Sequence, residues 1–253
     1  MNALAAELDR WGEAGRRAAL WWRDDDVSAP RPELDRILTI SQSLAIPVSL
    51  SVIPAATQPG LLEATGDPAL LSIFQHGWAH VNHEPAGGQS ELGDGRPANV
   101  VLAELTRGRA RLMELFGAAR VPPVLVPPWH SLSQRVAARL PETGIRCVSM
   151  LAAGQHLPEI APGVALICAN VDLVRWRNAP GFVGAPEAVR RLLGALRARR
   201  LGLIDGATPV GLLTHHWALD ADAGRFLEAL GRLVNDHPAA RWIRPSWPDA
   251  PAA

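Results

Sequence analysis

The chain has 253 residues, with 25 basic and 25 acidic side chains and a formal net charge of zero. This balance gives no reason to expect nucleic acid or an anionic membrane surface as a partner. No apolar run approaches the ~18–20 residues that span a bilayer, which argues against membrane insertion. The N-terminal segment contains acids within an amphipathic pattern, so no export signal is visible. We therefore expect a cytoplasmic protein whose residues 1–253 form one domain, and the oligomeric state is unknown at this stage.

Short apolar segments alternate with longer segments of helical spacing along the chain. After an N-terminal helix over 1–17, strands are expected at 18–25, 47–53, 70–77, 122–129, 145–150, 164–174, 209–217 and 241–246. Helices are expected at 31–45 (opened by Pro32), 99–117 (ended by Gly117), from Ser133 onward, at 186–200 and at 221–237. Nearly continuous apolar strands are buried on both faces and hence mostly parallel. The class is therefore α/β, either a closed or nearly closed (β/α) barrel or a doubly wound open sheet.

Polar and aromatic clusters follow five of the predicted strands. They are DDD at 24–26, HGWAHVNH at 76–83, PPWH at 127–130, NVDLVRW at 170–176 and THHW at 214–217. Active sites of parallel α/β folds lie at the carboxyl ends of the strands. The clusters therefore predict a functional site built from several strand ends.

The pair His76 and His80 is four residues apart. In a helix both imidazoles would lie on one face, and in a loop the spacing still permits chelation of one cation. Two histidines and one carboxylate are a common site for zinc, and the same set suits iron, cobalt, nickel or manganese. Two unrelated polar loop histidines are the plainer alternative, but an acidic cluster at another strand end favours the metal.

The three aspartates supply what such a site lacks. One carboxylate would bind the metal, and another would take a proton from water during hydrolysis. An N-cap or Asx turn before Pro30 explains one aspartate but not all three. His215 and His216 offer a proton donor for the leaving group, or are buried structural histidines.

The remaining candidates would line a substrate site. Pro127 and Pro128 fix the backbone before Trp129, whose aromatic face suits sugars and acyl groups, although tryptophan is also an ordinary core residue. The Gly-rich segment 84–99, which includes Arg96, is either a lid or an ordinary flexible insertion. The predicted lining residues are Pro128, Trp129, His130, Arg96, Arg175 and His216.

The order of these motifs resembles the polysaccharide deacetylase family, carbohydrate esterase family 4. Its five motifs are an Asp-Asp pair, H-S/T-x-x-H, R-x-P-Y/W, D-x-x-D-W and L-x-L-x-H. In this chain RDDDV, HGWAH, VPPW, DLVRW and LLTHH stand in the same order over residues 23–216. The sequence looks like a divergent, cytoplasmic branch of that family. The resemblance implies a distorted (β/α) barrel with about seven mostly parallel strands.

The resemblance also implies roles for individual residues. Asp25 would be the catalytic base, and Asp26, His76 and His80 would bind one divalent metal ion, zinc by expectation. His215 would be the catalytic acid, with His216 as the alternative. An alignment of the pair on Asp24 and Asp25 remains open.

The implied activity is metal-dependent hydrolysis. A water on the metal would attack the acyl carbonyl and release an N- or O-linked acetyl group from a sugar or glycan precursor. The alternatives are an amidohydrolase of a small non-sugar amide and a catalytically weakened barrel that binds glycans.

Two positions depart from the family's pattern. Val126 stands in place of the arginine of the third motif, which helps to hold the base, and Arg175 replaces the second acid of the fourth motif. Arg23, Arg96 and Arg175 are the candidates to hold Asp25 instead.

Overall fold

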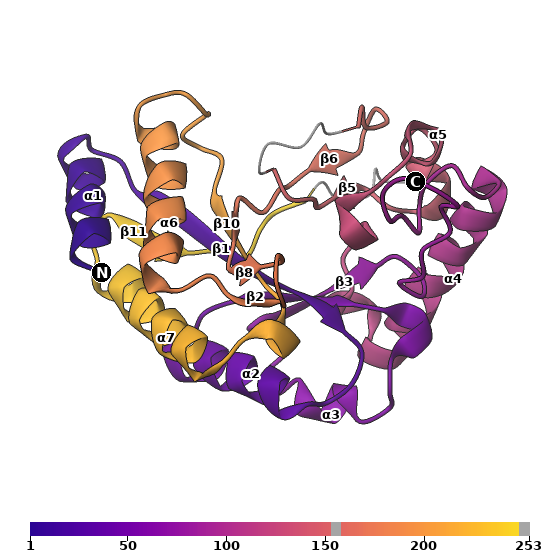
Figure 1. Ribbon diagram of the computed structural model, residues 1–253, viewed down its shortest axis with the longest axis horizontal. Coiled ribbons are helices and arrows are strands. Elements are labelled where there is room, and N and C mark those ends of the chain that lie inside the picture. Colours follow the sequence, from indigo (N-terminus) through magenta and orange to yellow (C-terminus); the bar gives the residue numbers. More distant parts are fainter. Residues whose placement is uncertain (153–157, 248–253) are drawn as a thin grey trace. The chain divides into compact units, whose positions relative to one another are not determined.

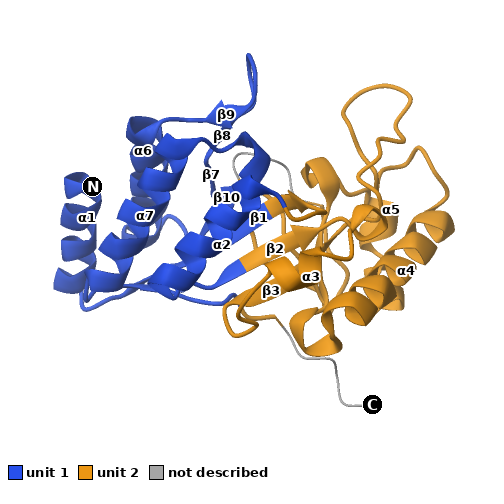
Figure 2. Ribbon diagram, turned by 90° about the horizontal axis from the view of Figure 1, so that it is seen from below, with its two compact units in different colours: residues 1–24, 31–48, 169–245 blue, residues 25–30, 49–168, 246–253 orange. Residues whose placement is uncertain are grey.

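The computed structural model describes residues 1–152 and 158–247, and these residues form two compact units (Figure 2). The first unit comprises residues 1–24, 31–48 and 169–245. The second comprises residues 25–30 and 49–168, without the undescribed 153–157, together with 246–247. The chain passes from the first unit to the second between Asp24 and Asp25, inside a single strand. The prediction of one domain stays a prediction.

The first unit is built on parallel strands in the order β11-β1-β10-β7. Leu20 pairs with Val210 and Asp24 with Thr214, so strand β1 carries Asp24 alongside the end of β10. The strands are β1 (Ala18–Val27), β7 (Val171–Asp172), β10 (Val210–Thr214) and β11 (Ala240–Trp242), with an antiparallel hairpin of β8 (Val174–Arg175) and β9 (Gly181–Phe182). The helices are α1 (Asn2–Glu13), α2 (Pro32–Leu44), α6 (Ala185–Arg200), α7 (Ala221–Asp236) and a 3-10 turn at His216–Ala218 (Figure 1).

The second unit contains neighbouring strands in the order β2-β3-β4-β5-β6. The β3–β4, β4–β5 and β5–β6 pairs are parallel. The strands are β2 (Val48–Val52), β3 (Leu71–His76), β4 (Val124–Val126), β5 (Cys147–Val148) and β6 (Ala165–Leu166). The helices are α3 (Leu61–Ala64), α4 (Ala98–Phe116) and α5 (Gln134–Ala137), with 3-10 turns at Pro54–Ala56, Ala118–Arg120, Pro128–His130 and Leu140–Thr143. A core that includes Leu105, Leu125 and Val148 packs α4 against these strands.

The helix boundaries follow from local chemistry. Pro32 opens α2, where its missing N–H has no partner to lose. Gly117, with a φ of 82°, ends α4 because a residue without Cβ adopts that angle without strain. The hydroxyl of Ser133 accepts a hydrogen bond from the backbone N–H of Val136 and so caps α5. These predicted starts and stops are confirmed.

The predicted strand at 164–174 is wrong, because this segment contains the separate short strands β6, β7 and the start of β8. The side-chain oxygen of Asn170 accepts hydrogen bonds from Gly211 N and from Arg199 Nη2. The side chain of Asn170 thus accepts the hydrogen bond from Gly211 N that a backbone carbonyl would accept in a regular strand. The predicted helix from Ser133 is a single turn, because Pro141 prevents a longer one. The α/β class with mostly parallel strands is confirmed.

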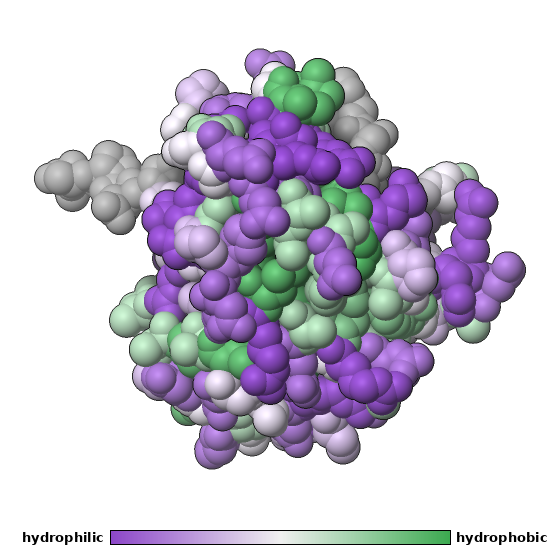
Figure 3. All heavy atoms as spheres, turned by 90° about the vertical axis from the view of Figure 1, so that its left-hand side faces the viewer, coloured by the Kyte–Doolittle hydropathy of each residue, from purple (hydrophilic) through white to green (hydrophobic). Residues whose placement is uncertain are grey.

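The face of the molecule that includes α1 and α6 is shown in Figure 3, where hydrophilic side chains surround scattered hydrophobic ones. Three of the exposed hydrophobic residues, Leu201, Leu203 and Ile204, follow the end of α6. No helix in the described residues is long and apolar enough to cross a membrane.

Candidate metal centre

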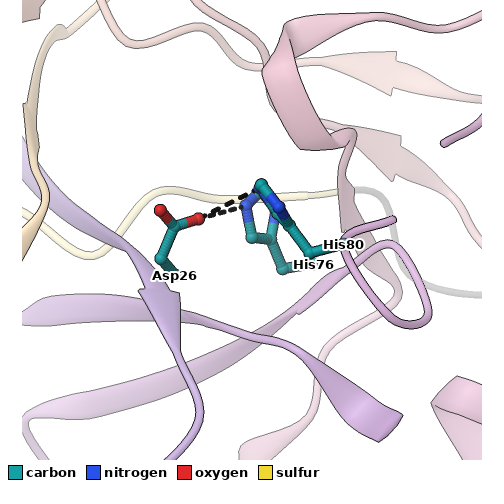
Figure 4. A group of neighbouring side chains, drawn as sticks. All are labelled: Asp26, His76 and His80. Atoms are coloured by element: carbon teal, nitrogen blue, oxygen red, sulfur yellow. Dashed lines mark hydrogen bonds and ion pairs between the residues drawn. The ribbon is translucent and has the colours of Figure 1, made fainter. Parts of the chain in front are cut away.

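Asp26, His76 and His80 form a compact group of possible metal ligands (Figure 4). Asp26 is near the end of β1, His76 is the last residue of β3, and His80 follows four residues later. One oxygen of Asp26, Oδ1, lies 3.1 Å from His76 Nε2 and 3.2 Å from His80 Nε2. Asp26 and His80 are about one-fifth exposed, with side-chain values of 19% and 21%, whereas His76 is buried. The group is therefore buried at His76 and partly exposed to solvent at Asp26 and His80.

The ring orientation of His76 leaves one nitrogen for a cation. His76 Nδ1 lies 2.9 Å from the carbonyl oxygen of Val126 on the neighbouring strand β4, which can only accept, so Nδ1 is the protonated nitrogen. In neutral His76, Nε2 therefore carries a lone pair that faces the carboxylate of Asp26. Two acceptors at this distance require a proton or a metal ion beside them.

The two distances from Asp26 Oδ1 to the imidazole nitrogens fit a small divalent cation. Ligand bonds of ~2.0–2.1 Å place neighbouring ligand atoms roughly 2.9–3.4 Å apart in octahedral or tetrahedral geometry. The two nitrogen–oxygen distances in the group are 3.1 and 3.2 Å. A backbone carbonyl on the second ring nitrogen is also the usual partner of a metal-binding histidine. The residues present thus fit a metal.

The electrostatics around His76 act in opposite directions. Burial lowers the pKa of His76, but the hydrogen bond to Asp26 and the negative charges of Asp25 and Asp26 outweigh it and raise the pKa above 6.5. Asp25 itself is fully buried. The surroundings of His76 therefore favour a positive charge, which a proton or a bound metal ion would supply.

Unusual backbone angles accompany the group. Asp26, His80, Trp129 and His130 all have positive φ values, between 52° and 65°. Such conformations cost about 1–3 kcal/mol each for residues with a side chain, and they persist where the surrounding structure enforces them. Their concentration here supports a functional role for this part of the second unit.

Trp129 and His130, two of the predicted substrate-lining residues, line a cavity of about 430 Å³. The other lining residues are Gly88, Gln89, Ser131, Leu132, Met150 and Pro158. The ring of Trp129 lies 4.2 Å from the ring of His80, centroid to centroid, so one wall of the cavity adjoins the metal group. Pro128 is buried and packs toward Gly77.

The three arginines that could hold Asp25 differ in their surroundings. Arg96 makes an ion pair with Glu104 at 2.9 Å and donates to the backbone carbonyl of Glu91, and within the described residues none of its contacts is with Asp25. Arg96 is therefore not the arginine that holds Asp25. Arg175 is exposed on β8, and Arg23 is buried on β1.

Asp24 has two buried partners in the first unit. Its Oδ1 accepts from Thr214 Oγ1 at 2.6 Å, and its Oδ2 lies 2.7 Å from His216 Nδ1. The same hydroxyl of Thr214 accepts from Trp22 Nε1 at 2.9 Å. His216, which the sequence made a candidate lining residue, is thus buried against a carboxylate.

His215 lies among aromatic rings of the first unit. Its ring meets that of Trp176 edge-on at 4.7 Å and lies 6.1 Å from Trp217. Trp176 is held by its indole N–H, which donates to Asp172 Oδ2 at 2.7 Å. His215 is nearly buried, and its Nδ1 makes no hydrogen bond within the described part of the chain. The predicted acid histidine is therefore nearly buried and packs edge-on against Trp176.

Sequence reasoning missed Glu91. Its carboxylate is buried and accepts hydrogen bonds from the backbone of the turn between the two histidines. The Gly-rich segment 84–99 looked like a lid or a flexible insertion, but its residues Ser90 to Leu92 are buried. The only signal was a Ser-Glu-Leu triplet within a segment rich in glycine.

Replacing Thr214 by valine tests the network around Asp24. Valine keeps the shape but leaves the Trp22 N–H and one Asp24 oxygen without this hydroxyl, so the free energy of unfolding should fall by about 2–4 kcal/mol. Urea unfolding measures this. Thr106→Val is the control, because among the described residues that hydroxyl bonds only to a carbonyl of its own helix. Equal losses in both variants would show that the network has no special weight.

The raised pKa of His76 predicts how the stability of the metal-free protein depends on pH. A folded-state pKa above the unfolded value stabilises the fold fully below about pH 6.5, and this contribution is lost as pH rises through the folded pKa. The stability difference between wild type and His76→Gln should therefore shrink from pH 6 to 9. Denaturant unfolding midpoints of the metal-free proteins measure this difference. A difference that stays constant with pH would contradict a raised pKa of His76.

No family model matches the sequence, and no curated protein sequence matches it. Solved structures do match. A protein from Mycobacterium smegmatis that is described as a polysaccharide deacetylase aligns over 89% of this chain and 86% of its own, with 16% identity and a TM-score of 0.63.

Two further structures align over similar lengths. A peptidoglycan N-acetylglucosamine deacetylase covers 93% of both chains with 12% identity and a TM-score of 0.56. A family 4 acetyl xylan esterase from Clostridium thermocellum, in complex with a cobalt ion, covers 89% of this chain and 87% of its own with 12% identity and a TM-score of 0.52. The chain therefore has the α/β fold that these deacetylases and esterases share.

Proposed function

We propose that this protein is a metal-dependent hydrolase that removes an N- or O-linked acetyl group from a sugar or glycan precursor. The observation that carries the proposal is the meeting of two imidazole nitrogens and one carboxylate oxygen at Asp26, His76 and His80. The shared fold adds support, because the solved structures with this fold include a peptidoglycan N-acetylglucosamine deacetylase and an acetyl xylan esterase.

Asp26, His76 and His80 would hold one divalent ion. Zinc is the first candidate, and cobalt is the ion named with the acetyl xylan esterase. Such an ion, when bound, polarises a carbonyl and lowers the pKa of water. The position of Asp26 beside both histidines favours the pairing of Asp25 and Asp26 as base and ligand. The environment of Asp24 favours the same pairing, because both carboxylate oxygens of Asp24 already have partners in the first unit.

The proton transfers are assigned to two other residues. Asp25 is buried, and its charge acts on His76, so it is the proposed base that takes a proton from the attacking water. His215 is the proposed acid that gives a proton to the leaving nitrogen or oxygen, on the basis of the sequence resemblance. Trp129 offers an aromatic face for a sugar ring or acetyl group at the cavity that it lines.

Metal analysis tests the ligands. Purified protein supplied with zinc or cobalt should hold about one ion per chain, and Asp26→Ala and His80→Ala should lose most of it while they remain folded by circular dichroism. His83→Ala is the matched control, because His83 lies three residues beyond His80 and outside the ligand group. Full metal content in both ligand variants would refute the site, and a wild type without metal would favour the glycan-binding alternative.

Asp25→Asn tests the base. This variant should keep its metal, yet turnover of acetylated chito- and xylo-oligosaccharides should fall by roughly 10²–10⁴-fold. Asp94→Asn is the control, since that carboxylate is exposed and pairs with Arg135. Activity of Asp25→Asn within twofold of wild type would remove Asp25 as the base. Turnover of small cyclic amides in place of sugars would favour the amidohydrolase alternative.

A further inference from the structure

The turn Gly77–Ala79 joins the two histidines, and its backbone is held by a buried carboxylate. Glu91 Oε2 accepts from the backbone N–H of Trp78 at 3.0 Å, and Oε1 accepts from that of Ala79 at 2.6 Å. Hydrogen bonds to an ionised acceptor are among the strong ones. Both oxygens of one side chain are therefore committed to the two residues that immediately precede His80.

The same turn is held at its carbonyl groups. Gln75 Nε2 donates to Gly77 O at 3.0 Å, and the backbone N–H of Ala55 donates to Trp78 O at 2.8 Å. The turn is thus bonded on both sides, and Glu91 supplies the acceptors for its N–H groups. His80, the next residue, then has a φ of 55°, a conformation that surrounding structure must enforce.

Glu91 is itself fixed in place. Arg96 donates to the backbone carbonyl of Glu91 at 3.1 Å and pairs with Glu104 of α4 at 2.9 Å. The neighbouring Leu92 is buried and forms a bridge with Leu132. Glu91 is only 1% exposed. The backbone of Glu91 is therefore anchored to a helix and to the core, which fixes the position from which its carboxylate reaches the turn.

Gly77 shows how closely the carboxylate fits. A Cβ at this position would lie 1.9 Å from Glu91 Oε2 and 2.7 Å from Pro128 Cγ. Gly77 also has a φ of 56°, which side-chain-bearing residues rarely adopt. The motif that this segment resembles has serine or threonine here. In this chain the carboxylate of Glu91 occupies that space.

We propose that Glu91 is a positioning residue of the metal site: it fixes the turn from Gly77 to Ala79 so that His80 Nε2 meets Asp26 beside His76. The inference rests on the proposed metal site, because the proposed role of Glu91 is to position a ligand of that site. Glu91 touches neither the ion nor the substrate in this account. Arg96 assists through the backbone of Glu91.

Glu91→Gln is the variant that separates positioning from general stability. The amide has nearly the same shape, but it offers one acceptor oxygen, and its NH₂ group would face a backbone N–H. Glu84→Gln is the matched control, because Glu84 lies in the same loop and accepts from the backbone N–H of Gly95, away from the turn. Arg96→Met is a second, milder variant.

Calorimetric titration with Co²⁺ on folded protein gives the first readout. The dissociation constant should rise tenfold or more in Glu91→Gln, less in Arg96→Met, and stay within twofold in Glu84→Gln. An unchanged constant in folded Glu91→Gln would overturn the proposal, even if that variant melts at a lower temperature.

The position of the His80 ring in metal-free protein gives the second readout. Trp129 lies 4.2 Å from this ring and should shift its proton resonances, and Glu91→Gln should change that shift while Glu84→Gln should not. If wild type binds no Co²⁺, the proposed function fails, and the ring shift alone still decides whether Glu91 positions His80. An unchanged ring shift would overturn the positioning role.

Discussion

One carboxylate oxygen that faces two imidazole nitrogens is the constraint on which the candidate site depends. Asp26 Oδ1 lies within 3.2 Å of both His76 Nε2 and His80 Nε2. Because His76 Nδ1 donates a hydrogen bond to the carbonyl oxygen of Val126, the lone pair of Nε2 faces Asp26, and the arrangement calls for a positive charge, either a proton or a metal ion. The second unit maintains this geometry through a strand pair on one side and a bonded turn on the other. Four residues with strained backbone angles lie at or beside it.

The run of three aspartates is explained by three different environments. Asp24 accepts a hydrogen bond from Thr214 and lies against His216. Asp25 is fully buried, and Asp26 is exposed enough to bind a metal ion. Adjacent carboxylates are tolerated because each has its own surroundings and a cation is expected among them. The backbone assists, since a φ of 65° takes Asp26 out of the extended strand conformation.

Much of this was predictable from the sequence, since apolar runs and helix caps act locally. Pro32, Gly117 and Ser133 stand where the helices begin or end, and the polar clusters do follow the strands. The features that the sequence did not predict depend on contacts between residues far apart in the chain. The segment 164–174 is apolar enough for one strand, yet contacts of Asn170 with distant residues interrupt it. Glu91 and Arg96 act through hydrogen bonds to backbone atoms far along the chain, and no residue pattern encodes such partners.

The central claim is that Asp26, His76 and His80 bind one divalent metal ion. The most direct measurement is an anomalous difference map at the zinc edge, from crystals grown with zinc. We expect one peak about 2.0–2.2 Å from His76 Nε2, His80 Nε2 and an oxygen of Asp26. An empty site, or a peak bound by other residues, would contradict the account.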